Sequence, residues 1–164
     1  MPLYFAYGSN IDTGAMARRC PRSVAIGPAR LARHRLAAMR EGWLTVVRDQ
    51  RQTVHGVLWN LALSDAPALD RYEDVGRGLY RKALQSVATS AGAKRALIYF
   101  GANAGPGIVP PDYIEAIIAA ARQWGLPLAP FEAFRTTGAS AAAQGDERSN
   151  GVRIRPRFAT PLDR

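Results

Sequence analysis

The sequence has 164 residues, of which 48% are hydrophobic, and its formal net charge at pH 7 is +9. These values fit one domain with a buried core and exclude a disordered chain. No apolar run is long enough to span a membrane and no signal-peptide pattern is present, so we expect a cytoplasmic protein.

Short apolar segments separated by turn residues make up the first 61 positions. Residues 3–7 predict a strand that ends at Gly8-Ser9-Asn10, after which Asn10 or Asp12 can cap a short helix to about Cys20. Branched and aromatic residues then predict three strands, at about residues 24–36, 43–48 and 53–61.

The middle of the chain predicts two helices and two further strands. Ser64 can cap a helix from Asp65 to about Tyr72, and strands follow at about residues 79–89 and 94–100. From Pro111 onward, apolar residues recur at the spacing of an amphipathic helix that ends before Gly125. Its apolar positions are Ile114, Ile117, Ile118, Ala121 and Trp124.

The composition changes after about residue 137. A weak helix is predicted near residues 131–134, and residues 138–144 are rich in Ala, Gly and Ser, which indicates a linker. A basic segment, Arg153–Arg157, follows it. We therefore expect one domain over residues 1–137 and a linker with a basic tail over residues 138–164.

Strands and helices are mixed without regular alternation, which argues for an α+β fold with largely antiparallel pairing. Consecutive strands with short connections favour a curled sheet or a small barrel, with helices packed against its outside or closing its ends. The sequence contains no internal repeat that would indicate a solenoid.

The turn Tyr7-Gly8-Ser9-Asn10 is the first candidate site. A glycine directly after a buried strand, followed by two small polar residues, lets several backbone N–H groups point in one direction. Such a turn attracts anions and can stabilise an oxyanion. The alternative is a plain strand-to-helix turn in which Asn10 serves only as a cap.

Glu73 is the second candidate, at the end of a predicted helix and just before a glycine-rich stretch. The negative end of a helix disfavours ionisation of a carboxylate, and burial would raise its pKa further. Both effects suit a general acid or base that works near neutral pH. The alternative is an exposed glutamate in a surface loop.

Other polar residues are weaker candidates. Tyr80, Tyr99 and Tyr113 lie near predicted element boundaries, where they could line a pocket or be ordinary half-buried tyrosines. His34 and His55 lack a third ligand at a suitable spacing, so no metal site is predicted. The arginines beside Cys20 could lower its thiol pKa, although an incidental cysteine fits as well.

Four segments in this order resemble the γ-glutamyl cyclotransferase family and its AIG2-like relatives. Tyr4–Asn10 is similar to the N-terminal strand and substrate turn of that family, and Val54–Trp59 to its central strand. Leu69–Val75 resembles the segment that bears the catalytic glutamate, with Tyr80 at the expected offset. Tyr99 and residues 111–127 resemble the late strand and closing helix, so the likeness runs from about residue 3 to 135.

The resemblance implies a small mixed, largely antiparallel β-barrel with surrounding helices, and an enzyme that needs no metal or cofactor. The expected reaction releases 5-oxoproline from a γ-glutamyl amino acid, peptide or amine, with Glu73 as general base and then general acid. The turn is expected to bind the substrate through Tyr7, Gly8, Ser9 and Asn10. Tyr80, Tyr99 and Tyr113 are expected to close the substrate pocket and donate phenolic hydrogen bonds.

One position departs from the family pattern, because Asp74 stands where relatives usually have glycine. A glycine there suits a turn with positive φ, which Asp tolerates less well. Asp74 also sets a second carboxylate beside Glu73, and two buried like charges would raise the pKa of the pair.

Two alternatives to the cyclotransferase stay open. One is a protein of the same fold that binds a small molecule without turnover. The other, less favoured, is a basic module that binds nucleic acid, since a net charge of +9 permits such contact. Trp43, Phe131 and Phe134 could supply the apolar contact surface of a homodimer.

Overall fold

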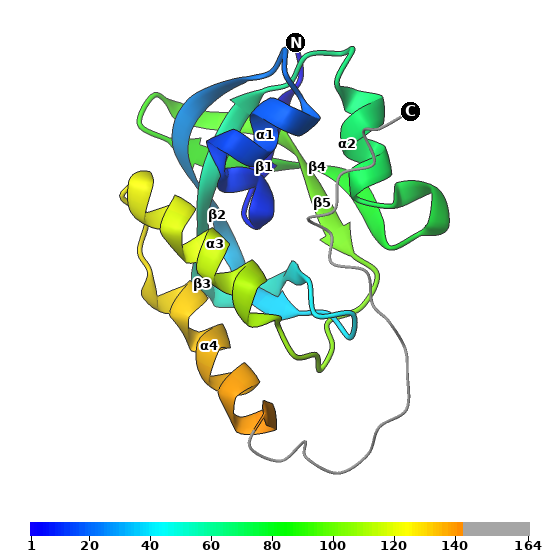
Figure 1. Cartoon of the computed structure of the whole chain (residues 1–164). Coiled ribbons are helices and arrows are strands. Elements are labelled where there is room, and N and C mark those ends of the chain that lie inside the picture. Colours follow the sequence, from blue (N-terminus) through cyan, green and yellow to red (C-terminus); the bar gives the residue numbers. More distant parts are fainter. Residues whose placement is uncertain (143–164) are drawn as a thin grey trace.

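The computed structural model describes the backbone of residues 1–142 and the side chains of residues 1–135. Within this part, five strands close into a barrel in the order β1-β3-β2-β4-β5 (Figure 1). Neighbouring strands pair antiparallel except for β1 and β5, which are parallel. The strands are β1 (Leu3–Ala6), β2 (Val24–Ala38), β3 (Leu44–Asn60), β4 (Tyr80–Thr89) and β5 (Gly92–Gly101). This confirms the expected mixed, largely antiparallel barrel.

The long hairpin of β2 and β3 differs from the expected strand pattern. The sequence predicts a break between residues 48 and 53, but β3 runs through it as one strand. Polar, mostly exposed residues at 49–52 keep an extended backbone, while the pairing with β2 shifts register between Ala32 and His34. The polar interruption therefore marks a bulge in the ladder and not the end of a strand.

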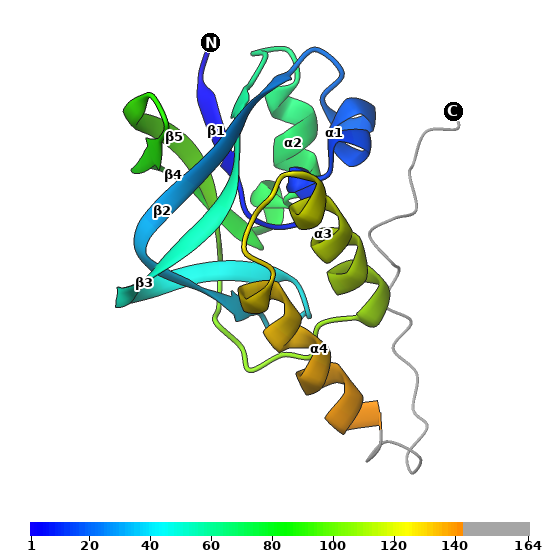
Figure 2. The same ribbon diagram turned by 90° about the vertical axis from the view of Figure 1, so that its left-hand side faces the viewer.

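The helices gather on one side of the barrel (Figure 2). The α-helices of the described residues are α1 (Thr13–Arg19), α2 (Ala66–Tyr72), α3 (Pro111–Gln123) and α4 (Ala129–Ala142). None of the helices described over residues 1–142 has the length and apolar character needed to cross a bilayer. Helix α4 is longer than expected and includes the first residues of the predicted linker. The rest of the predicted linker and the basic tail lie outside the described residues.

The two predicted N-caps have different outcomes. Asp12 caps α1, because its side chain accepts a hydrogen bond from Ala15 N at 2.8 Å. The Ser64 cap is wrong, because Asp65 occupies the N-cap position of α2 and its side chain makes no capping bond. The Asp65 carboxylate instead accepts hydrogen bonds from Arg22 N at 2.9 Å and Ser23 Oγ at 2.8 Å.

Two close contacts fix the segment that leads into the candidate site. Gly56 on β3 lies against β1, where a Cβ atom would collide with the carbonyl oxygen of Ala6. Helix α3 buries its predicted apolar face against the core, and Trp124 Nε1 donates to the Ile11 carbonyl at 2.8 Å. The turn after β1 is therefore held by the barrel on one side and by α3 on the other.

Candidate active site

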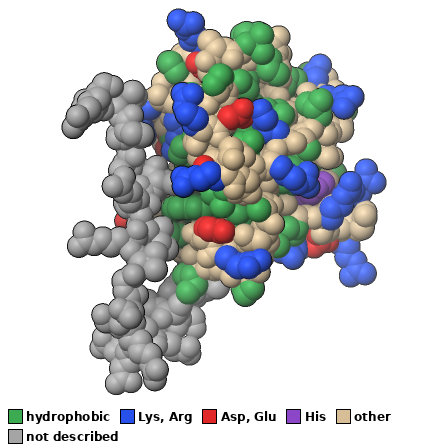
Figure 3. Space-filling view, turned by 90° about the vertical axis from the view of Figure 1, so that its right-hand side faces the viewer, with side chains coloured by type: hydrophobic (Ala, Val, Ile, Leu, Met, Phe, Trp, Pro, Cys, Tyr) green, Lys and Arg blue, Asp and Glu red, His purple; other side chains and the backbone are tan. Residues whose placement is uncertain are grey.

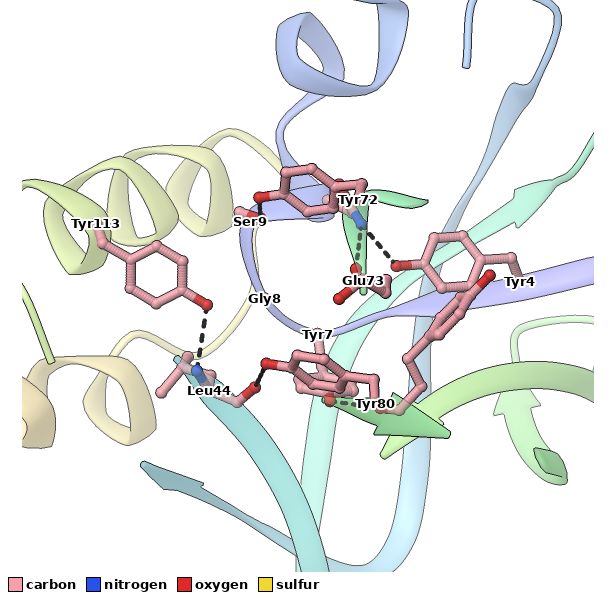
Figure 4. A pocket seen from close by; sticks show the side chains of 11 residues that line it. Tyr4, Tyr7, Gly8, Ser9, Leu44, Tyr72, Glu73, Tyr80 and Tyr113 are labelled. Atoms are coloured by element: carbon pink, nitrogen blue, oxygen red, sulfur yellow. Dashed lines mark hydrogen bonds between the residues drawn. The ribbon is translucent and has the colours of Figure 1, made fainter. Parts of the chain in front are cut away.

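Two segments far apart in the sequence meet at one end of the barrel. The turn Gly8–Asn10 follows β1, and Glu73 is the C-terminal cap of α2. Asn10 Nδ2 donates to Glu73 Oε1 at 2.9 Å, and Ser9 Oγ lies 2.8 Å from the Tyr72 hydroxyl. Both candidates from the sequence therefore line one pocket (Figure 4).

The backbone of the turn forms one short 3-10 helix, Ser9–Ile11. Its hydrogen bonds use the N–H groups of Ile11 and Asp12, which donate to the Gly8 and Ser9 carbonyls at 3.0 and 3.3 Å. Within the described part of the chain, the N–H groups of Gly8, Ser9 and Asn10 donate to no backbone carbonyl. They are the donors that this turn can offer to an anion.

The Glu73 side chain is buried, with 7% of the residue exposed. Its backbone N–H donates to the Leu69 carbonyl at 2.9 Å, so the residue is held at the end of α2. In Figure 4 its carboxylate points into the space between the turn and the surrounding tyrosines. This excludes the alternative of an exposed surface glutamate.

Asn10 connects the turn to Glu73 through its side chain, which the sequence did not predict. Its Nδ2 donates to both Glu73 and the Tyr4 hydroxyl, the latter at 3.0 Å, while its Oδ1 accepts from Arg19 at 2.5 Å. The Arg19 guanidinium in turn lies 3.6 Å from the centre of the Tyr72 ring. Because Arg19 can only donate, it fixes the amide with its nitrogen toward the carboxylate.

The expected tyrosines all line the pocket, but two of their hydroxyls donate to the protein. Tyr80 donates to the Leu44 carbonyl at 2.7 Å, and Tyr99 donates to Asp70 Oδ1 at 2.6 Å. Tyr113 accepts from Leu44 N at 3.2 Å. Tyr80 and Tyr99 are therefore part of the pocket wall, and the expected role of the three tyrosines in substrate binding stays a prediction.

Comparisons with known proteins identify the family. A family model described as gamma-glutamyl cyclotransferase, AIG2-like, matches residues 4–118. The chain belongs to this family. The gamma-glutamylcyclotransferase of Bos taurus is 31% identical over 137 residues, which cover 77% of this chain and 73% of that protein. That of Mus musculus is 32% identical over 136 residues, covering 76% and 72%. A solved structure described as a gamma-glutamyl cyclotransferase has a TM-score of 0.74 at 29% identity, covering 82% of this chain and 86% of that one.

Sequence reasoning missed several residues of this pocket. Tyr4, Tyr72 and Leu44 line the pocket, and Arg19 and Asp70 hold its lining residues in place. Tyr4 and Tyr72 lie inside the segments that carry the resemblance, so their position beside the turn and Glu73 was a usable signal. Leu44 and Asp70 act through contacts between strands and helices that no local pattern encodes.

Burial keeps the phenols of Tyr4, Tyr7 and Tyr99 protonated. Burial, and secondly the nearby Glu73, raise the pKa values of Tyr4 and Tyr7 well above the usual range. Burial and the hydrogen bond to Asp70 raise the pKa of Tyr99. Tyr7 also donates to the Tyr99 carbonyl at 2.5 Å. These side chains therefore act as neutral hydrogen-bonding groups around the carboxylate.

Asp74 takes the backbone conformation expected of the glycine it replaces, with φ 54° and ψ 40°. Its side chain points to the surface, where it pairs with Arg77 at 3.0 Å. About a third of that side chain is exposed, at 32%. Asp74 is therefore not a second buried carboxylate beside Glu73, and the expected rise in the pKa of a buried pair does not apply.

Cys20 does not have the lowered thiol pKa that its arginine neighbours suggested. The side chain is buried, and burial with a contribution from Asp65 raises its pKa to about 12, although Arg19 acts in the opposite direction. The interpretation as an incidental cysteine fits this environment.

Proposed function

We propose that this chain is a γ-glutamyl cyclotransferase that releases 5-oxoproline from a γ-glutamyl amino acid, peptide or amine, with Glu73 as its general acid and base. The observation that carries the proposal is the buried Glu73 carboxylate, which shares a pocket with the N–H groups of the Gly8–Asn10 turn. The family membership and the named relatives support the same activity.

The first step is proton removal from the substrate. The α-ammonium group of a γ-glutamyl compound has no lone pair, so it must lose a proton before its nitrogen can attack. Glu73 takes that proton as the general base. The N–H groups of Gly8, Ser9 and Asn10 hold the substrate carboxylate or the γ-carbonyl oxygen, which keeps the glutamyl chain folded. Because nucleophile and carbonyl belong to one molecule, this folding removes much of the entropic barrier.

The second step forms the ring. The α-nitrogen bonds to the γ-carbon, and the negative charge moves to the carbonyl oxygen, where backbone N–H groups can stabilise it. The carbon–nitrogen bond to the departing amine then breaks, and the protonated Glu73 gives its proton to that amine. The ring nitrogen still carries two hydrogens and a positive charge after the attack, so it also loses one proton, which the released amine takes up. The products are 5-oxoproline and the amine in its ammonium form, and Glu73 returns to its starting carboxylate form.

The alternatives have less support. Figure 3 shows a face on which Lys and Arg side chains are interspersed with hydrophobic and acidic ones, without a continuous basic patch. Lys82 and Arg135 are paired with acidic side chains at 2.7 and 2.5 Å. The named relatives, which are gamma-glutamylcyclotransferases, favour the enzyme over a binding protein of the same fold.

The test is to measure 5-oxoproline after incubation with γ-glutamyl-alanine, a γ-glutamyl-lysine amide and glutathione in parallel. Glu73→Gln keeps the shape of the side chain but cannot accept the proton, so kcat should fall by about 10²–10⁴-fold. Asp112→Asn, an exposed carboxylate in the first turn of α3, is the matched control and should keep full activity. Equal activity of wild type and Glu73→Gln would refute the mechanism, and no product from any substrate would favour the binding protein.

A cytoplasmic location and a homodimer stay predictions. The apolar surface expected for the dimer is smaller than the sequence suggested, because Trp43 and Phe131 are buried, with 7% and 1% exposed. Phe134 is half-buried and packs against the core cluster. A homodimer of this chain would therefore need contacts from other residues.

A further inference from the structure

A second cavity lies on the barrel, apart from the candidate active site. Its volume is about 380 Å³, within the usual range of small-molecule pockets. Strands β2 to β5 and the loop after β5 line it, and it shares no residue with the active-site pocket. The polar and aromatic side chains that line it are those of His34, Arg48, Arg81, Gln85, Phe100 and Asn103.

The cavity is located where β2 and β4 separate. The two strands pair at one position only, Arg30 with Ala88. Beyond it, Arg33 takes a positive φ of 58° and the register between β2 and β3 shifts. A bulge of this kind bends a strand and redirects the side chain that follows. The bulge therefore accounts for the opening and for the inward position of His34.

The polar groups that line the cavity are cationic or neutral. His34 is buried, with 5% exposed, and its Nδ1 lies 2.9 Å from the Ala32 carbonyl. A carbonyl can only accept, so Nδ1 carries a proton and Nε2 is the ring atom left for a ligand. Within residues 1–135, Nε2 has no hydrogen-bond partner.

Two arginines add positive charge to the same cavity. Arg81 is held with its guanidinium 5.0 Å from the centre of the Phe100 ring, and the His34 ring centre lies 6.1 Å from that ring. Among the described residues, neither Arg48 nor Arg81 forms an ion pair. No acidic residue lines the cavity.

The nearest carboxylates along the chain bond to side chains other than Arg48 and Arg81. Asp49, next to Arg48, pairs with Arg35 at 3.7 Å. Glu41 accepts from the amide nitrogen of Asn103 at 3.0 Å, and the Asn103 oxygen accepts from two backbone N–H groups. Neither carboxylate therefore forms an ion pair with Arg48 or Arg81.

We propose that this cavity is a second ligand site, which binds a small metabolite carrying a dianionic group such as a phosphate or a pair of carboxylates. Guanidinium groups bind such oxyanions through paired, charge-assisted hydrogen bonds. His34 Nε2 and the Gln85 amide supply further polar contacts, and the Phe100 ring supplies an apolar wall. The site is independent of the cyclotransferase chemistry, because Glu73 and the Gly8–Asn10 turn take no part in it.

The test uses the full chain, labelled with ¹⁵N, and follows amide chemical shifts during titration with inorganic phosphate, succinate or adenosine monophosphate. Sodium chloride at matched ionic strength is the blank. We expect saturable shifts of Val47, Gln85 and Gly101, with dissociation constants in the millimolar range or tighter. Phosphate and succinate distinguish a phosphate ligand from a dicarboxylate. Adenosine monophosphate shows whether an aromatic ring attached to the phosphate adds affinity.

Variants separate a built site from general charge attraction. The double variant Arg48→Gln/Arg81→Gln should bind the probe about tenfold more weakly or worse, because each substitution removes a charge-assisted hydrogen bond to the anion. Arg51→Gln with Arg95→Gln removes the same charge from exposed strand positions outside the cavity and should leave the affinity within about twofold. Glu73→Gln should bind as the wild type does, so a failed cyclotransferase proposal would not affect this result.

Three outcomes would overturn the proposal. The first is no saturable shift with any probe, and the second is an equal loss of affinity in both double variants. The third is a set of shifts confined to Gly8–Asn10, which would place the anion in the active site. Thermal unfolding of each variant checks that its fold is intact.

Discussion

Replacing Asn10 by alanine tests the link between the turn and the carboxylate. The change removes the donor to Glu73 Oε1, the donor to the Tyr4 hydroxyl and the acceptor of Arg19. A hydrogen bond to a buried charged group contributes about 1.5–3 kcal/mol, and one to a neutral group about 1 kcal/mol. Arg19 is half-exposed and can bond to water instead. We therefore expect the free energy of unfolding to fall by about 3 kcal/mol.

The same change should affect the chemical step more than substrate binding. The backbone N–H of residue 10 survives in the alanine variant, while the Glu73 carboxylate loses the group that aligns it. Misplacement of a catalytic group by about 1 Å can cost about 10²-fold in rate. We expect kcat to fall by about that factor, with KM changed by less than about threefold.

The assay combines thermal unfolding with 5-oxoproline release, measured well below both melting temperatures on the best wild-type substrate. For a chain of this size, a loss of about 3 kcal/mol lowers Tm by about 6–12 °C. Asn60→Ala, at the half-buried end of β3, is the control and should change neither quantity much. A raised KM with unchanged kcat would show that the side chain acts on the substrate, which contradicts this reasoning. A lower Tm with unchanged kinetics would reduce Asn10 to a structural role.

Two further predictions concern the turn and the response to alkaline pH. A Cβ at Gly8 would lie 3.4 Å from the Tyr113 hydroxyl, inside the pocket, so Gly8→Ala should raise KM several-fold. Gly76→Ala is the control, because a Cβ there meets no other atom, and it should leave KM unchanged. Equal KM values for the two variants would argue against substrate binding at the turn. Burial raises the folded-state pKa of Cys20 from 9.0 to about 12. The unfolded chain therefore loses the thiol proton at a lower pH than the folded chain does. As pH rises above 9, the free energy of unfolding should fall by about 1.4 kcal/mol per pH unit because of this thiol. Denaturant unfolding between pH 8 and 11 measures the free energy of unfolding against pH. Cys20→Ala should flatten that dependence between pH 9 and 10, where the buried tyrosines do not yet contribute. An unchanged dependence in the variant would show that the thiol is not the cause.

Local patterns predicted the elements well where one face of an element is buried. The apolar spacing of α3 and the strand-ending turn at Gly8 both follow from burial against the barrel, and both are present. The meeting of the turn with Glu73 came from the family resemblance, because nothing in either segment alone specifies a partner 63 positions away.

The hydrogen bonds of the site were outside the reach of the sequence. Tyr80 and Tyr113 bond to the carbonyl and the N–H of Leu44, and which strand edge meets a phenol depends on register, not on composition. The polar run at residues 49–52 led to the wrong prediction of a break between two strands. Exposed polar residues are compatible with either a loop or an extended strand, so composition alone could not decide between them.

The bonds that join Asn10 to Glu73 and Ser9 to Tyr72 also have a consequence for folding. Each spans 63 residues, whereas the β2–β3 and β4–β5 hairpins close over short turns. Contacts of long sequence separation form late, because the chain between them must first be ordered. A molecule with both hairpins in place would thus have nearly all of its strand content and still lack its candidate active site. Enzyme activity therefore reports the completed native state, while secondary structure alone does not.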